Sequence, residues 1–250
     1  MKPWRALTRQ LLDTHCHVFD YQDPEAVLAA VCAADMRVHV MSQSTAEFAT
    51  NAEHCDGVRV RPALGLFPTL VTPDTVETLV AEFAAALPRT RLVGEVGLDF
   101  VTDDPALRSS QILAFREVLA LCDGAGGKVL SVHSRRSAAE AIEVVQAATS
   151  PVILHWFSGT VEQVLRAGTW FSVNAAMLRS RKGRERVAAM PRERVLLETD
   201  GPYVTVGGRP GQPLDLRHVA EGLARLWEVS LADAVERLAE NGRELFSAQS

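Results

Sequence analysis

Short runs of aliphatic and β-branched residues alternate with longer stretches of helical periodicity along this chain. The predicted strands cover residues 11–15, 38–41, 58–64, 91–95, 128–133, 151–155, 169–174 and 194–200. The predicted helices cover residues 24–34, a segment from about 45, 73–87, 105–122, 137–148, 161–167, 216–227 and 231–246. Because eight strands that alternate with helices are typical of the α/β class, we expect a (β/α)8 TIM barrel, formed as a single domain by residues 1–250.

Residue types that bind metals stand at the ends of several of these strands. His15 and His17 are two residues apart, so both side chains point to the same side of a strand. The pair alone also fits two ordinary core or surface histidines, and the other strands decide between the two interpretations. The complete set of metal-binding types at strand ends is His15, His17, Glu95, His133, His155 and Asp200. In a barrel these ends meet on one face. A nitrogen and oxygen donor set without cysteine favours Zn, Mn or Mg over a purely structural zinc.

The composition limits where such a protein works and what it attracts. The formal net charge is −5, so we expect no general attraction to nucleic acid or to an anionic membrane, and any nucleic-acid contact has to be local. The four cysteines form no C-x-x-C pair and predict reduced thiols in a cytoplasmic protein. Neither a secretory h-region in the first ten residues nor an apolar run of 18 residues is present, so we expect no secretion and no membrane span.

Five motifs, in order, resemble the TatD family of metal-dependent deoxyribonucleases, a branch of the amidohydrolase-like barrels. They are DTHCH, VGEVGLDF, VHSRRS, LHWFSGT and LLETDGPY, and the segment NGRELF at 241–246 is similar to the closing helix of the family. The resemblance runs from about Leu12 to Phe246. It implies a barrel of the metal-dependent hydrolase type, two divalent metal ions per chain (Zn, Mg or Mn), and hydrolysis of DNA, often from the 3′ end.

The resemblance also implies roles for the predicted ligands. Glu95 would bridge the two ions, and Asp200 would lie close to the reacting water. One ion would be held by His15 and His17, and the other by His133 and His155. The chemistry agrees, since two ions about 3.5–4 Å apart activate a shared water, and a carboxylate accepts its proton. Glu95 and Asp200 are therefore the predicted catalytic residues.

This sequence departs from the family pattern at several positions. Phe67 in Gly65–Pro68 stands where the family usually has histidine, which predicts a slower enzyme or a different substrate. Arg136, Trp156 and Gly201 replace an acidic residue, Cys and Ser, respectively. The HWFSG and ETDGPY variants are similar to the TatD-like nuclease of bacterial Qat anti-phage operons. That similarity implies a role in anti-phage defence and partner proteins from the same system.

Four residues are predicted to contact the substrate. Arg135, directly after His133, fits either a phosphate contact or a structural ion pair. Phe67 and Tyr203 fit stacking on a base or ordinary packing. Arg209, in the Gly-rich loop 206–213, fits an anion contact, although a plain connecting loop is the simpler interpretation. The five cations between residues 179 and 186 fit a phosphate-tracking groove, but a solvated helix face explains them as well.

The sequence therefore supports one main hypothesis and two alternatives. The main hypothesis is a metal-dependent deoxyribonuclease that acts as a 3′–5′ exonuclease on single-stranded or frayed 3′ ends. The first alternative keeps the barrel and the metals but acts on another ester or amide. Glu95 argues against it, because many amidohydrolases bridge their metals with a modified lysine on the fourth strand. The second alternative is a catalytically weakened DNA-binding subunit of a defence complex, in which Phe67 marks the loss of activity.

Overall fold

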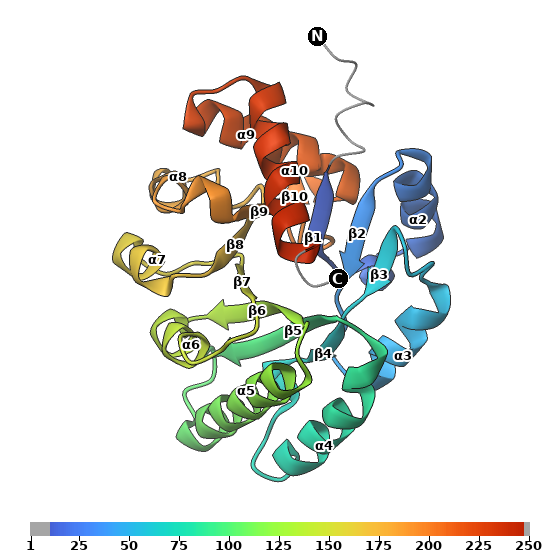
Figure 1. Cartoon of the computed structure of the whole chain (residues 1–250), viewed down its shortest axis with the longest axis vertical. Coiled ribbons are helices and arrows are strands. Elements are labelled where there is room, and N and C mark those ends of the chain that lie inside the picture. Colours follow the sequence, from blue (N-terminus) through green and yellow to red (C-terminus); the bar gives the residue numbers. More distant parts are fainter. Residues whose placement is uncertain (1–10, 248–250) are drawn as a thin grey trace.

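The computed structural model describes residues 11–247, and its strands form a ring surrounded by helices (Figure 1). The strands are β1 (Leu12–Cys16), β2 (Arg37–Val40), β3 (Val60–Pro62), β4 (Leu64–Leu66), β5 (Leu92–Asp99), β6 (Val129–Arg135), β7 (Val152–His155), β8 (Trp170–Val173) and β9 (Val195–Leu197). All pairs between neighbouring strands of this sheet are parallel, in the order β3-β2-β1-β9-β8-β7-β6-β5-β4. The predicted α/β class and TIM barrel are confirmed.

The third predicted strand is divided in two, and this division closes the barrel. β3 pairs with β2 and β4 pairs with β5, while only Ala63 separates β3 from β4 along the chain. The Ala63 N–H donates to Val40 O at 2.8 Å, so the segment continues along β2 before it turns to β5. Together β3 and β4 occupy one position of the eight that the sequence predicts. The prediction of a continuous strand over 58–64 is wrong in its bounds.

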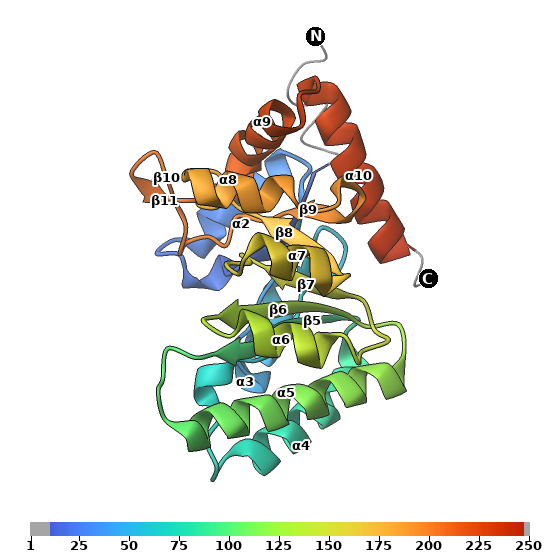
Figure 2. The ribbon, with the colours of Figure 1, turned by 90° about the vertical axis from the view of Figure 1, so that its left-hand side faces the viewer.

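Helices cover the outside of the strand ring on all sides (Figures 1 and 2). They are α2 (Pro24–Ala33), α3 (Thr45–His54), α4 (Val76–Ala86), α5 (Pro105–Ala125), α6 (Ala138–Val145), α7 (Val161–Ala167), α8 (Arg181–Ala188), α9 (Leu216–Trp227) and α10 (Leu231–Ser247). Several begin where a side chain caps the first backbone N–H groups, as Asp23 does for Ala26 N at 2.9 Å. The strands consist mostly of apolar residues because the helices bury their outer faces while the barrel interior buries their inner faces.

Helix α10 closes one end of the barrel. Its Leu245 and Phe246 pack against the first halves of several strands, including Val129 of β6 and Ile153 of β7. Asn241 donates to Val195 O at the start of β9, at 2.7 Å. Helix α10 therefore covers the amino-terminal ends of β6, β7 and β9, and the predicted ligands lie toward the carboxyl ends. None of the helices in residues 11–247 carries an apolar stretch long enough to cross a membrane.

Strands β5 and β6 run further than the sequence predicts. We expected β5 to end at Glu95, but it continues to Asp99 in register with β6. Gly97 makes this possible, since its φ is +130° and a Cβ atom there would lie 2.2 Å from His133 O. Glu95 and His133 consequently lie inside their strands and not at the last residue. The other differences are smaller, as α4 begins at Val76 and β9 stops at Leu197.

Candidate metal centre

The two histidines of the DTHCH motif, His15 and His17, lie side by side at the carboxyl end of β1. His15 is in the strand and His17 follows it directly, and their Nε2 atoms are 3.2 Å apart. Both side chains are buried, with 0% and 3% of the residue surface exposed. The prediction that they point to the same side is confirmed by this distance.

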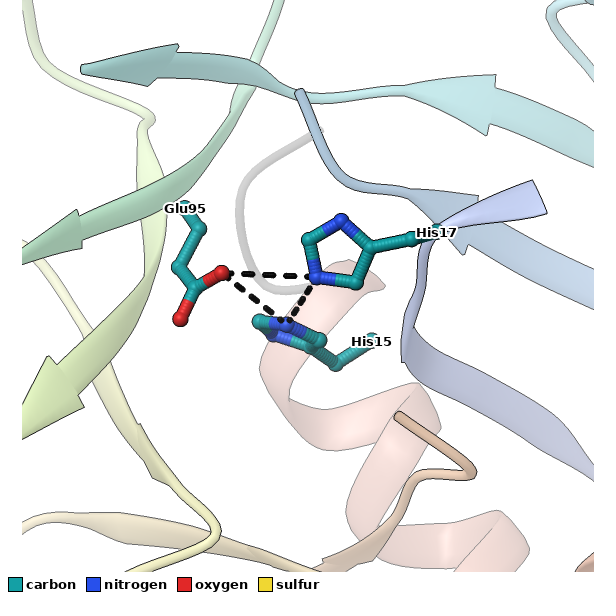
Figure 3. A group of neighbouring side chains, drawn as sticks. All are labelled: His15, His17 and Glu95. Atoms are coloured by element: carbon teal, nitrogen blue, oxygen red, sulfur yellow. Dashed lines mark hydrogen bonds and ion pairs between the residues drawn. The ribbon is translucent and has the colours of Figure 1, made fainter. Parts of the chain in front are cut away.

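Glu95 stands between two groups of nitrogen donors. Its Oε2 atom lies 3.3 Å from His17 Nε2 and 3.7 Å from His15 Nε2. Figure 3 shows the Glu95 carboxylate facing both rings. Its Oε1 atom lies 2.6 Å from His133 Nδ1 and 2.8 Å from His155 Nε2. One carboxylate therefore faces a separate histidine pair with each of its oxygens.

Asp200 joins the group formed by the first pair. Its Oδ1 atom is 3.6 Å from His15 Nε2 and 3.7 Å from His17 Nε2. The Asp200 N–H donates to His15 O at 2.9 Å, and its φ is +47°, a left-handed conformation that a non-glycine residue adopts only when its surroundings hold it. The structure thus brings together all six predicted ligands: His15, His17, Glu95, His133, His155 and Asp200.

The spacing of these donor atoms fits metal ions. For metal–nitrogen distances of about 2.0–2.1 Å, ligand atoms of a tetrahedral ion lie about 3.3 Å apart. The group of His15, His17, Glu95 and Asp200 has donor separations of 3.2–3.7 Å. The group of Glu95, His133 and His155 is tighter, because Glu95 Oε1 is at hydrogen-bond distance from both nitrogens. The residues present therefore fit two ions that share Glu95.

A second set of side chains holds the histidines, and the sequence interpretation assigned none of them a role. Ser131 Oγ lies 2.7 Å from His15 Nδ1, and Asp99 Oδ2 lies 3.1 Å from His133 Nε2. Glu198 lies near His155, with Oε2 3.7 Å from His155 Nδ1. A partner on the second ring nitrogen fixes which nitrogen faces the metal. The period of two along a strand could have found Ser131 and Asp99, which share a face with His133 and Glu95, respectively.

Glu198 is itself held in place at the end of β9. It is fully buried and accepts hydrogen bonds from Ser172 Oγ, from Asn174 Nδ2 at 2.8 Å and from the Trp156 N–H at 3.0 Å. These donors come from β8 and from the loop after β7, so Glu198 links three neighbouring strand ends. It fixes the backbone directly after the predicted ligand His155.

Burial and mutual contact shift the pKa values of the donors. Burial alone would raise the pKa of Glu95, but the neighbouring His155 and His133 outweigh it and hold that pKa well below its usual range. Burial lowers the pKa of His15, and the nearby His155 adds to the effect. For His155, burial acts to lower the pKa, but Glu95 and Glu198 raise it well above the ordinary value. Carboxylate and imidazole groups bind a metal ion in their deprotonated forms, so a cation bound here would displace the protons that these shifts describe.

A cavity of about 670 Å³ opens above these donors, and three of the four predicted substrate contacts line it. They are Phe67, Arg135 and Tyr203. Phe67 lies edge-on to His133, with ring centres 5.2 Å apart, and Tyr203 lies edge-on to His17 at 5.0 Å. The Arg135 side chain is 63% exposed, and its Nη1 atom is 4.0 Å from Asp99 Oδ2. Trp156, which the sequence interpretation recorded only as a departure from the family, also lines the cavity and is 38% exposed.

The structure places Arg209 elsewhere. The predicted loop contains a short hairpin of β10 (Thr205–Val206) and β11 (Arg209–Pro210), and Arg209 is not among the residues that line the cavity. Its two terminal nitrogens each lie 2.8 Å from a carboxylate oxygen of Asp215. Nor do the cations of the 179–186 segment line the cavity. They belong to α8 and its approach, where Arg181 pairs with Glu185 at 2.7 Å.

Comparisons with known proteins agree with this geometry. The family model described as TatD related DNase matches residues 12–247. The chain is 27% identical to human deoxyribonuclease TATDN3 over 97% of this chain and 96% of that protein. It is 30% identical to the uncharacterized metal-dependent hydrolase YjjV of Escherichia coli, over 91% of this chain and 93% of that one. The crystal structure of YjjV superposes with a TM-score of 0.80, covering 96% of this chain and 99% of that chain at 28% identity. The 3′-5′ ssDNA/RNA exonuclease TatD of Edwardsiella piscicida is 32% identical over 64% of this chain and 66% of its own length.

Proposed function

The chain belongs to the TatD-related DNase family of metal-dependent hydrolases, and from this premise we propose that it hydrolyses phosphodiester bonds of DNA as a 3′–5′ exonuclease. The observation that carries the proposal is the position of Glu95. Each of its oxygens faces a different histidine pair, at 3.3 Å from His17 Nε2 and at 2.6 Å from His133 Nδ1. A carboxylate in this position suits two neighbouring cations, which is the arrangement that phosphodiester hydrolysis commonly uses.

The same residues would hold the two divalent ions. His15, His17 and Asp200 would bind one, His133 and His155 the other, and Glu95 both. Divalent ions bound there would polarise a phosphate oxygen and lower the pKa of a bound water. Imidazole and carboxylate donors accept Zn, Mn and Mg, so the donor set does not select among them.

Asp200 is the residue placed to accept a proton from the attacking water. Its carboxylate lies at the carboxyl end of the barrel, and its backbone is anchored to His15 O. A fixed carboxylate beside the water removes the proton without having to reorganise first. Arg135 projects into the same cavity, and its guanidinium can donate two parallel hydrogen bonds to a phosphate.

Three aromatic residues around the cavity suit unpaired bases. Phe67, Trp156 and Tyr203 come from the ends of different strands and surround the donor groups. Tyr203 is 55% exposed, and its hydroxyl donates to Asp20 Oδ2 at 2.7 Å, which fixes the ring. Aromatic faces stack on any base that is free of its own duplex partner. We therefore propose that single-stranded or frayed 3′ ends are the preferred substrate.

The decisive experiment is cleavage of oligonucleotides labelled at the 3′ or the 5′ end by metal-reconstituted protein. A chelated sample and Glu95→Gln are compared with Glu117→Gln, a control on the exposed side of α5. We expect shortening from the 3′ end that requires both metal and Glu95 and is unchanged in the control. No cleavage despite two bound ions would refute the nuclease proposal. It would favour another ester or amide substrate, or a DNA-binding subunit in which Phe67 beside His133 has replaced the family histidine.

We further propose that the protein works in the cytoplasm as part of anti-phage defence, together with partner proteins. The support is the similarity of its HWFSG and ETDGPY segments to the nuclease of Qat operons, and its four free cysteines fit a reducing compartment. Phage plating on cells that carry the native gene neighbourhood tests the idea. Protection that is lost with Glu95→Gln supports it, and equal plating with and without the intact gene contradicts it.

A further inference from the structure

A second cavity, of about 400 Å³, lies at the end of the barrel opposite the metal donors. Its floor is formed by Leu92 and Val129, the first residues of β5 and β6, and by Phe246 of α10. Three arginines line its walls, namely Arg61, Arg89 and Arg91. In a barrel enzyme this amino-terminal end normally serves stability, so a cavity lined by three cations here is unexpected.

The positive charge at this end extends beyond the cavity walls. Burial lowers the pKa of Arg37, and repulsion from the nearby Arg243 and Arg61 lowers it further. Lys128, directly before β6, is buried and donates to two carbonyl oxygens, at 2.8 Å to Leu87 O and 2.6 Å to Thr90 O. Like charges thus gather at one end of a chain whose net charge is −5.

Several arginines at this end of the barrel have no carboxylate partner among the described residues. Within residues 11–247, no carboxylate lies at ion-pair distance from Arg37, Arg61, Arg89 or Arg243. Of the acids near it in the chain, Asp35 pairs with Arg59 at 2.9 Å. Asp56 accepts backbone N–H groups of Val58, Arg59 and Val60. An anion from outside the chain would relieve the repulsion that these acids leave in place.

The arginines are also held in position. Arg61 Nε donates to Gly57 O at 3.2 Å, and Arg91 Nε donates to Gly127 O at 3.3 Å. The Arg89 guanidinium lies over the Phe48 ring, 5.3 Å from its centre. Among the described residues, the Arg61 guanidinium donates only through Nε, so its two terminal amino groups can donate in parallel to one anion. Guanidinium groups fixed in this way lose less freedom when they bind a phosphate.

We propose that this cavity, which we call the basal arginine cavity (Arg61, Arg89, Arg91 and the residues between them), binds an anion that carries several phosphate groups. The ligand is either a free oligophosphate, such as a nucleoside triphosphate, or the backbone of a nucleic-acid strand. Several forked donors around one cavity match several phosphates better than a single carboxylate. The cavity lies at the far end of the barrel from the metal donors, so it is a second site, and it does not depend on the proposed nuclease activity.

Calorimetric titration of the full-length protein with sodium triphosphate tests the proposal. It is performed once with the metal-loaded protein and once with excess chelator, because metal ions at the catalytic end also bind phosphate. We expect one binding event that survives chelation, and at least tenfold weaker binding in Arg61→Gln and in Arg89→Gln. The affinity of Arg61→Lys should lie between those of the wild type and Arg61→Gln, since lysine keeps the charge but lacks the two parallel N–H donors of the guanidinium group. Arg116→Gln, which removes an exposed arginine that pairs with Glu143 on the outer helices, should bind as the wild type does.

The source of the phosphates follows from competition with a twelve-residue thymidine oligonucleotide in the chelated protein. Displacement of triphosphate by the oligonucleotide assigns the site to nucleic acid, and failure to displace it assigns the site to a free oligophosphate. Circular dichroism checks that the variants fold, and a salt series gives a second measurement, because the salt dependence of binding should weaken in Arg89→Gln. Absence of binding in the chelated wild type, or binding by both glutamine variants with the affinity of the wild type, would overturn the proposal.

Discussion

Replacing Asp99 with asparagine should weaken one of the two proposed metal-binding groups and spare the other. Asp99 Oδ2 lies 3.1 Å from His133 Nε2, while its Oδ1 accepts the Val101 N–H at 2.9 Å. The change Asp99→Asn keeps the shape of the side chain but leaves only one acceptor oxygen, so it cannot serve both partners. His133 then loses the contact that fixes its ring.

The size of the effect follows from this contact. Removing the carboxylate behind a histidine ligand typically lowers metal affinity by about 10–100-fold, which corresponds to about 1.4–2.8 kcal/mol. The loss should be confined to the ion held by Glu95, His133 and His155. The other group depends on His15, which Ser131 supports at 2.7 Å, and this contact does not involve Asp99.

Competition with a chromogenic chelator resolves the two affinities in one zinc titration. Asp103→Asn is the matched control, since Asp103 is fully exposed and pairs with Arg108 at 2.8 Å, away from the predicted ligands. We expect one affinity to fall in the Asp99 variant and neither to fall in the control. Equal weakening of both sites, or no change in either, would refute the assignment of Asp99 as the residue that positions His133.

Three further changes test other parts of the structure. Burial, with the charges of Arg61 and Arg37, lowers the pKa of His39 to about 3. As the pH falls below about 6.5, His39 is protonated in the unfolded chain but stays neutral in the folded protein. The free energy of unfolding therefore decreases between about pH 6.5 and pH 3. In urea titrations between pH 7.5 and 5.5, the free energy of unfolding should fall by about 1.4 kcal/mol less in His39→Gln than in the wild type. An equal fall in both proteins would contradict the lowered pKa of His39. Phe83→Ala leaves a cavity at a fully buried position of α4 and should lower the free energy of unfolding by about 3–5 kcal/mol. This corresponds to a fall in Tm of about 6–20 °C, and a fall under about 2 °C would argue against a place for Phe83 in the core. Trp156→Ala should weaken binding of a single-stranded oligonucleotide by about 1–3 kcal/mol in fluorescence anisotropy and leave zinc affinity unchanged, whereas unaltered DNA binding would exclude stacking at this position.

Much of the barrel and of the metal centre could be predicted from the sequence because both follow from local patterns. Apolar runs that end in His or acidic residues mark the strands, and parallel strands carry these ends to one face. His15 and His17 meet because side chains two residues apart point to the same side of a strand. The pairing of Glu95 with both histidine groups was an expectation from family resemblance, and its distances come from the structure.

The features that could not be predicted depend on contacts between distant segments. β5 runs on to Asp99 because Gly97 fits against His133 O, a neighbour from another strand. Arg209 pairs with Asp215, a choice that its Gly-rich surroundings do not specify. The three arginines of the second cavity, Arg61, Arg89 and Arg91, come from two separate chain segments, and neither of these segments shows a motif.

Anomalous diffraction from crystals of the Mn-loaded protein is the most direct test of the central claim that Glu95 is shared by two metal ions. We expect two anomalous peaks, one between Glu95, His15, His17 and Asp200 and the other between Glu95, His133 and His155. A single peak at full occupancy, or a second ion bound away from Glu95, would contradict the claim.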